Sequence, residues 1–174
     1  MSALESQRPQ SPRSPGPRHR EYIGLLIGAA RRRVKQALVA GLAGHDLDPR
    51  EFWLLLAVQD LPDCSAGALV ERQRSDMSTV SRLLARFARR GLVRLNRDRT
   101  DKRRAVVTLT AAGRRLATRV RPLADQIRAT IVQDLTAAEE DALREGLRRV
   151  VANLEGLLRA QAEAPVRVRK AARS

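Results

Sequence analysis

The stretch that decides the fold runs from Asp76 to Gly113 and reads DMSTVSRLLARFARRGLVRLNRDRTDKRRAVVTLTAAG. Its first part carries apolar residues at three- and four-residue spacing, which predicts a helix over residues 77–90. The residues of this stripe are Val80, Leu83, Leu84 and Phe87. Asp76 can cap the first amides, and Gly91 is typical of the helix end. Alternating apolar and polar residues then predict two strands within residues 93–109, joined by a short turn.

The side of this helix opposite the apolar stripe predicts a surface for DNA. Small hydroxyl side chains near the helix N-terminus allow close approach to base edges, and the helix N-terminus favours phosphate. An arginine on the same side can reach guanine or phosphate. An ordinary surface helix with arginine for solubility is the alternative interpretation. The candidate DNA-binding residues of the helix are Ser78, Thr79, Ser81, Arg82 and Arg86.

The turn between the two predicted strands is strongly basic, with the sequence DRTDKRR at residues 98–104. Such a tip repels itself without an anionic partner, and an extended arginine suits the narrow, negative minor groove. We interpret Asp101 as a clamp that holds the tip by pairing with Arg103 or with turn amides. A helix followed by a hairpin with a basic tip is typical of a winged helix on DNA. The candidate DNA contacts of the tip are Arg99, Lys102, Arg103 and Arg104.

The charge of the whole chain points to the same partner. The 174 residues include 34 Lys and Arg against 19 Asp and Glu, a net charge of +15, so an acidic polymer or a membrane surface is expected. Twelve basic and four acidic residues lie between positions 66 and 110, against four basic and five acidic between 136 and 162. A basic middle beside a near-neutral end predicts a binding module joined to an assembly module. Because aromatic residues make up only 2%, duplex DNA is favoured over stacked single strands.

Other classes of protein find little support in the sequence. It contains no GxSxG, phosphate-cradling glycine loop, CxxC or HExxH motif, so we expect no enzyme, no metal and no cofactor. No apolar run is long enough to span a bilayer, and the basic start lacks the apolar stretch of a signal peptide. Cys64 is the only cysteine, which fits a reducing cytoplasm and a protein associated with the nucleoid. Its place beside a predicted helix start could lower the thiol pKa, yet we interpret Cys64 as an inert thiol.

The rest of the chain is predicted to be helical between two basic tails, residues 1–18 and 163–174. Residues 19–44 hold a first amphipathic helix, and residues 111–162 hold two more helices. The DNA-binding lobe, residues 45–110, begins with a helix announced by the N-cap Asp48, Pro49 and Glu51, followed by a short helix over residues 65–73.

The apolar stripes of the first and last two helices exceed what a small winged helix can cover. They predict contact with the helices of a second copy, with a monomeric helical bundle as the alternative. A two-fold dimer predicts a pseudo-palindromic site with half-sites about one helical turn apart. The stripe residues of the last two helices are Leu116, Val120, Leu123, Ile127, Ile131, Leu143, Leu147, Val150, Val151, Leu154 and Leu158.

From about Tyr22 to Leu158 the chain resembles the MarR family of transcriptional regulators, the winged helix-turn-helix dimers named for multiple antibiotic resistance. The phrases DMSTVSRLLARFARRGLV and DRTDKRRAVVTLTAAG, with helices on both sides, carry the resemblance. It implies a mainly α fold with a small β-hairpin wing, in which the first and last two helices form a dimerisation lobe. It also implies that Arg103 is the minor-groove arginine, that Asp101 is the wing aspartate, and that the hydroxyls and Arg82 of the helix face the major groove.

Three departures from the family pattern stand out. Gln73, Arg74 and Ser75 occupy places where the family usually has an apolar residue, a glycine and another apolar residue, which questions the geometry of the turn. Arg99 stands where proline is common in the wing. The first helix lacks the cysteine that peroxide-sensing members use there.

The resemblance further implies a repressor of an operator, released by a small aromatic or phenolic acid bound in a crevice between the dimer helices and the DNA-binding lobe. The candidate lining residues are Tyr22, His45, Phe52 and Trp53. Phe52 forms a staple pair with Leu47 and is expected in the core, which leaves Trp53 the better candidate. Ordinary packing is the alternative for each. A redox-sensing regulator working through Cys64 and a nonspecific architectural DNA-binding protein are the alternative functions.

Overall fold

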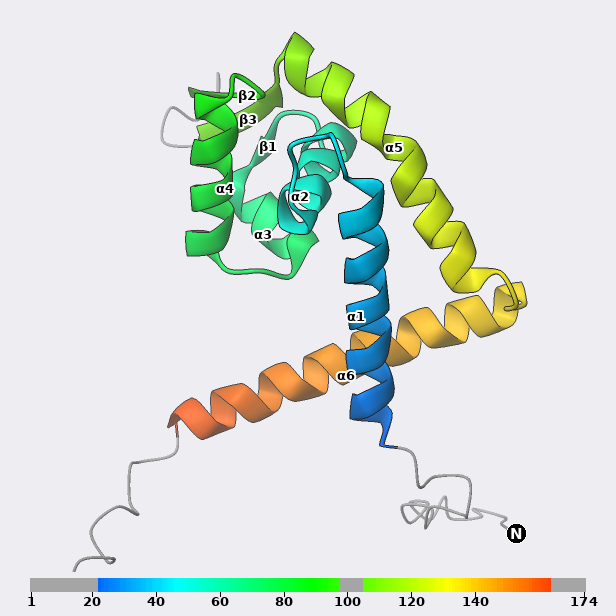
Figure 1. Cartoon of the computed structure of the whole chain (residues 1–174). Helices are drawn as coiled ribbons and strands as arrows, with labels where there is room; N and C mark the ends of the chain where they lie inside the picture. Colours follow the sequence, from blue (N-terminus) through cyan, green and yellow to red (C-terminus); the bar gives the residue numbers. More distant parts are fainter. Residues whose placement is uncertain (1–21, 98–104, 164–174) are drawn as a thin grey trace, which may run out of the picture. The chain divides into compact units, whose positions relative to one another are not determined.

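The computed structural model describes residues 22–97 and 105–163, and Figure 1 labels its helices and strands. The fold is mainly helical with one small antiparallel sheet, as the sequence predicts. The elements are α1 (Ile23–Gly41), α2 (Pro49–Asp60), β1 (Cys64–Ser65), α3 (Ala66–Gln73), α4 (Met77–Arg89), β2 (Val93–Arg97), β3 (Ala105–Leu109), α5 (Ala111–Val132) and α6 (Ala137–Glu163). The predicted tails lie outside the described residues, except that Glu163 ends α6.

The chain divides into two compact units after Asp125. The core of the first unit is formed by the apolar faces of α2, α3 and α4 together with the sheet. Its fully buried side chains include Phe52, Leu54, Leu55, Leu69, Val80, Phe87 and Val107. The predicted apolar stripe of α4 therefore faces inward, because Val80, Leu84 and Phe87 are all buried.

The capping signals that the sequence carries at the start of α2 are confirmed. Asp48 Oδ1 accepts hydrogen bonds from the Arg50 and Glu51 amides at 2.7 and 2.9 Å. Glu51 Oε2 accepts one from the Asp48 amide at 2.9 Å, which completes a capping box with Pro49 in the first turn. These local bonds fix where α2 begins and bring Glu51 into the protein interior.

A three-stranded antiparallel sheet follows the order β1, β3, β2. β2 and β3 form the predicted hairpin, in which Val93 pairs with Leu109 and Arg97 with Ala105. No pattern in the sequence predicts β1, which has only two residues and pairs Cys64 with Val107. This short strand exists because β3 offers it an edge, so no local pattern could announce it.

The junction between α4, the hairpin and α5 is held by backbone groups. Gly91 has a positive φ of 67°, and the Leu92 amide donates to the Phe87 carbonyl at 2.8 Å, which ends α4 as predicted. The Thr110 hydroxyl donates to the Gly91 carbonyl at 2.7 Å and accepts from the Gly113 amide at 3.0 Å. A Cβ at Gly113 would lie 2.0 Å from the Leu92 carbonyl oxygen, so only glycine fits there.

The second unit contains the end of α5 and α6. A capping box opens α6, in which the Thr136 amide donates to Glu139 Oε2 at 2.9 Å and the Glu139 amide donates to Thr136 Oγ1 at 3.3 Å. None of the residues of α6 is buried in this single chain, and its leucines are between 43 and 64% exposed. Within the described ranges, no helix is both long and apolar enough to cross a membrane.

The turn between α3 and α4 keeps its geometry in spite of the departure noted in the sequence. Arg74 adopts the left-handed conformation, with φ 45° and ψ 49°, and the Ser75 amide donates to the Val70 carbonyl at 3.2 Å. This is the position at which the family usually has glycine. A side chain with a Cβ is disfavoured in this conformation, so the turn stores backbone strain at Arg74.

We expect Arg74→Gly to stabilise the protein by about 1 kcal/mol, because glycine adopts a positive φ without steric cost. The melting temperature should rise by about 2–4 °C for a chain of this size. Glu71→Gly is the matched control: Glu71 lies inside α3, where glycine lowers helix stability. A melting temperature that falls in both variants would contradict strain at Arg74.

Candidate nucleic-acid interface

The outer face of α4 presents the side chains that the sequence assigns to DNA. Ser78, Ser81 and Arg82 are exposed, and Thr79 is half-buried. The helix lies at the edge of the first unit with the hairpin strands close to its C-terminal end (Figure 1). A row of small hydroxyls with one arginine is therefore open to a duplex, while the opposite face of the same helix is buried in the core.

Asp76 organises the first turn of α4. Its Oδ1 accepts a hydrogen bond from the Thr79 amide and its Oδ2 accepts one from the Thr79 hydroxyl, both at 2.8 Å. These two bonds are the main cause that lowers the pKa of Asp76. Arg82 lies back along the helix, with Nε donating to the Ser78 carbonyl at 3.4 Å and Nη2 to the Thr79 hydroxyl at 3.5 Å. Thr79 therefore takes part in the N-terminal cap of α4 and also orients Arg82, while part of its surface remains exposed.

The hairpin supplies a second exposed surface next to α4. On β2, Arg94, Leu95 and Asn96 are exposed, and Asn96 Nδ2 donates to Thr108 Oγ1 on β3 at 3.3 Å. The predicted tip residues Arg99, Asp101, Lys102, Arg103 and Arg104 lie outside the described residues. Their roles therefore remain predictions from the sequence.

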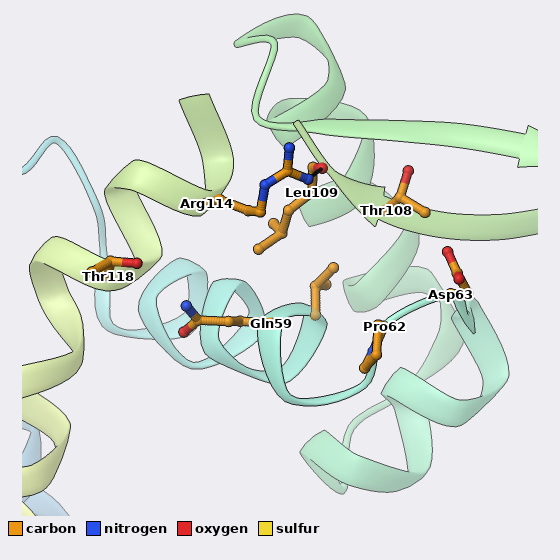
Figure 2. A pocket seen from close by; sticks show the side chains of 8 residues that line it. Gln59, Pro62, Asp63, Thr108, Leu109, Arg114 and Thr118 are labelled. Carbon is orange, nitrogen blue, oxygen red and sulfur yellow. Dashed lines mark hydrogen bonds between the residues drawn. The ribbon is translucent and has the colours of Figure 1, made fainter. Parts of the chain in front are cut away.

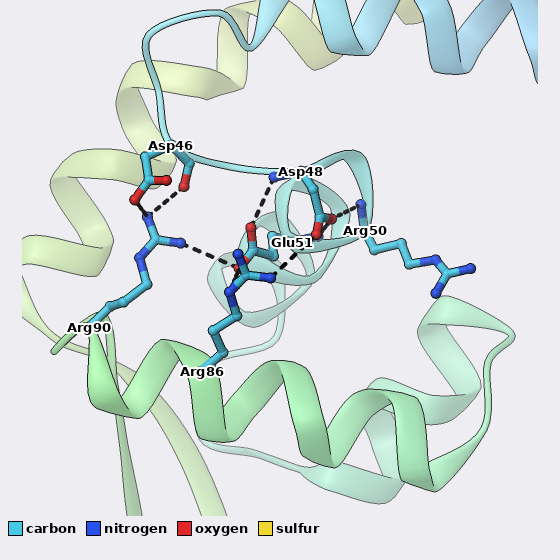
Figure 3. Close-up of polar contacts among 6 residues, drawn as sticks. All are labelled: Asp46, Asp48, Arg50, Glu51, Arg86 and Arg90. Carbon is cyan, nitrogen blue, oxygen red and sulfur yellow. Dashed lines mark hydrogen bonds and ion pairs between the residues drawn. The ribbon is translucent and has the colours of Figure 1, made fainter.

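Arg86 pairs with another residue of this chain, which the sequence does not predict. Its Nε lies 3.1 Å from Glu51 Oε1, and Arg90 Nη1 lies 3.3 Å from the same oxygen (Figure 3). Glu51 is completely buried, whereas the Arg86 side chain is half exposed. The DNA contact assigned to Arg86 stays a prediction, and the structure gives its guanidinium a second role. The capping motif at Glu51 was visible in the sequence, but its partners lie 35 and 39 residues away.

The four candidates for an effector crevice lie in different surroundings. Tyr22 is highly exposed before α1, and Phe52 has no exposed surface. Trp53 is 38% exposed and meets the Phe52 ring edge-on, with ring centroids 4.9 Å apart. His45 Nδ1 is buried without a hydrogen-bond partner among the described residues. Phe52 is a core residue here, as its place in the staple pair indicates, and Trp53 keeps a free surface.

A pocket of about 270 Å³ lies elsewhere, between the C-terminal end of α2, β3 and the start of α5 (Figure 2). Arg114 and Asp63 stand toward opposite ends of it, with Leu109 between them in the view. Arg114 Nη1 donates to the Leu109 carbonyl at 2.8 Å. The lining residues are Val58, Gln59, Pro62, Asp63, Thr108, Leu109, Arg114 and Thr118, and none of the four sequence candidates is among them.

Cys64 occupies a setting that opposes thiol chemistry. Burial raises the pKa of the Cys64 thiol, and Asp63 raises it further, against a smaller lowering by a backbone hydrogen bond. The burial of this side chain on β1 outweighs any lowering by the nearby helix start, in agreement with the interpretation of Cys64 as an inert thiol. A buried thiol with a raised pKa is a weak nucleophile, so the structure does not favour the redox-sensing alternative. Across the part of the chain that the structure describes, no cluster of His, Cys, Asp and Glu could hold a metal ion.

Together, α3, its strained turn, α4 with an open polar face, and the β2–β3 hairpin define a winged helix-turn-helix protein of the DNA-binding class. The sequence pattern of the MarR family matches residues 45–104. The chain belongs to this family and is a DNA-binding transcriptional regulator, not an enzyme.

Several known proteins are similar to this chain. The transcriptional regulator HosA of Escherichia coli is 32% identical over 106 residues, covering 61% of this chain and 78% of HosA. The transcriptional repressor NicR of Pseudomonas putida is 28% identical over 131 residues, covering 75% of this chain and 83% of NicR. A solved structure of Bordetella bronchiseptica BpsR, whose DNA binding is regulated by 6-hydroxynicotinic acid, is 30% identical with a TM-score of 0.65, covering 75% of this chain and 99% of that one.

The lowered pKa of Asp76 predicts a pH-dependent contribution to stability. The unfolded carboxyl titrates near 3.9, and the folded one titrates lower, so the contribution of this cap is complete above the unfolded pKa and disappears as the pH falls through the folded pKa. Asparagine caps a helix without titrating. We expect urea midpoints of the wild type and Asp76→Asn to be similar at pH 7, with the wild type losing stability relative to the variant below about pH 4. A constant difference from pH 7 to 3 would contradict this role.

Proposed function

We propose that this protein is a homodimeric repressor that binds a pseudo-palindromic operator and is released by a small aromatic or phenolic acid. The observation that carries the proposal is the open face of α4, where Ser78 and Arg82 are exposed opposite a buried apolar stripe and Ser81 is exposed on its flank. Such a helix can enter a major groove without disturbing the core. The relatives NicR and BpsR, a repressor and a protein regulated by 6-hydroxynicotinic acid, support the mode of control.

The apolar residues that this single chain leaves exposed support a dimer. On α1, Ile23 and Leu25 are each 66% exposed, and on α6 Leu157 and Leu158 are more than half exposed. Contiguous apolar surface on long helices marks an interaction site. Because a two-fold dimer presents two copies of α4, it should read two half-sites about one turn of duplex apart.

Selection from a random pool of duplexes tests sequence-specific binding. The bound pool should converge on an inverted repeat whose half-site centres lie about 10 base pairs apart, or a multiple of one helical turn. In competition at matched salt, the protein should prefer the selected duplex over a scrambled one by about 10³ or more. Equal affinity for both duplexes would favour the architectural alternative instead.

We propose that the effector binds beside Trp53, with His45 and Tyr22 as further contacts. The partly exposed indole and the unpartnered His45 Nδ1 support this place. Trp53 is the only tryptophan, so its fluorescence reports on binding directly. Titration with 6-hydroxynicotinic acid or benzoic acid, corrected for absorption, should quench the emission saturably and release the operator over the same concentration range.

Two variants locate the effector. Trp53→Leu should weaken release of the operator by the acid, while Arg114→Met, in the pocket of Figure 2, should leave the release unchanged. The reverse result would move the effector site to the pocket between α2, β3 and α5. Arg115→Met, which removes the neighbouring charge outside the pocket, controls for the general loss of one cation.

A further inference from the structure

The first turn of α2 contains a carboxylate that is shared between Arg86 of α4 and Arg90, the residue that caps the C-terminal end of α4. Glu51 has no exposed surface, and both of its oxygens are used: Oε2 accepts from the Asp48 amide, and Oε1 lies within 3.3 Å of nitrogens of Arg86 and Arg90. Arg90 Nη2 also donates to the Asp46 carbonyl at 2.6 Å. Figure 3 shows both guanidinium groups reaching from α4 toward this end of α2.

A buried carboxylate needs such partners because taking it out of water costs several kcal/mol unless the charge is paired and hydrogen-bonded. Charge-assisted bonds from arginine are also the strongest and most directional available. Two ion pairs with Glu51, from Arg86 on α4 and from Arg90 at its C-cap, fix both the rotation and the height of this helix against α2. The anchored arginines lie in the C-terminal half of α4, while the exposed hydroxyls and Arg82 lie in the other half.

Arg86 is the member for which two partners compete. It lies four residues after Arg82, which places it only about 40° away around the helix, on the side that carries the candidate DNA contacts. Its side chain is 51% exposed, so a phosphate could reach it if Glu51 did not hold it. A second carboxylate, that of Asp48, also lies close to Arg86, with Oδ2 3.7 Å from Nη1, and it strengthens the ion pairing that keeps Arg86 on the protein.

We propose that Glu51 is a positioning residue for sequence recognition, which orients α4 and withholds Arg86 from the DNA backbone. The inference rests on the proposed function. Each arginine that contacts a phosphate adds affinity for any duplex and steepens the dependence on salt, without reading sequence. Holding Arg86 on the protein therefore limits nonspecific binding while the N-terminal half of α4 is aligned with the bases.

Glu51→Gln is the decisive variant because glutamine can still accept from the Asp48 amide but carries no charge. Binding to the operator selected above and to a scrambled duplex should be measured between 50 and 300 mM salt. For the scrambled duplex, the slope of log K against log salt should steepen by about 0.9 for each freed arginine that meets a phosphate. The ratio of operator to scrambled affinity should fall at least tenfold.

Asp60→Asn is the matched control, with the same change in net charge at the other end of α2. Asp60 pairs with Arg72 of α3 and Arg121 of α5 and with no arginine of α4, so its loss should leave both the slope and the ratio as in the wild type. Combining Glu51→Gln with Arg86→Met should return the slope toward the wild-type value while the ratio stays low.

The remaining outcomes distinguish a failure of the proposal for Glu51 from a failure of the proposed function. If Glu51→Gln lowers both affinities in parallel with an unchanged slope, Glu51 serves the fold alone. If Glu51→Gln does not fold, Arg86→Met decides: a slope shallower by about 0.9 than in the wild type would show that Arg86 already contacts phosphate, against the proposal. An unchanged slope with a reduced ratio supports it. A wild type that never distinguishes the two duplexes would instead refute the proposed function.

Discussion

The buried charge of Glu51 is the constraint on which the DNA-binding lobe depends. A carboxylate with no exposed surface has to find donors inside the protein, and here the donors come from two directions. One is local, the Asp48 amide of the capping box. The other is remote, the guanidinium groups of Arg86 and Arg90. The same side chain that begins α2 therefore also determines where α4 lies.

The two ends of α4 are fixed by backbone conformation as well. Arg74 before it and Gly91 after it both have a positive φ, and each stands where a helix ends. Glycine accepts this conformation readily, whereas Arg74 is strained and is kept there by the packing of α3 and α4 around the turn. The helix is thus placed by a turn at each end and by the Glu51 contacts along its C-terminal half. Its N-terminal half is left free to meet another molecule.

The sequence alone predicts those structural features that depend on residues within one helical turn of each other. Asp48 and Glu51 announce α2, Asp76 announces α4, and Gly91 ends it, because each acts on backbone groups no more than four residues away. Other features have causes that lie far along the chain. The strand β1 depends on the edge of β3, which also buries Cys64 and raises its pKa. The partners of Glu51, and the close approach of Gly113 to the Leu92 carbonyl, follow only from the packing of separate elements.

A chain with a net charge of +15 gains affinity for any duplex easily, and the harder requirement is to prefer one sequence. Preference depends on which cations are unavailable as much as on which are exposed. In the first unit, Asp46, Asp48 and Glu51 pair with Arg86 and Arg90. Those ion pairs hold Arg86 on the protein, away from general phosphate binding, while joining the start of α2 to α4. These acidic residues change the net charge only slightly. They nevertheless affect the preference for one DNA sequence over others, because they determine which part of the basic surface can reach the DNA.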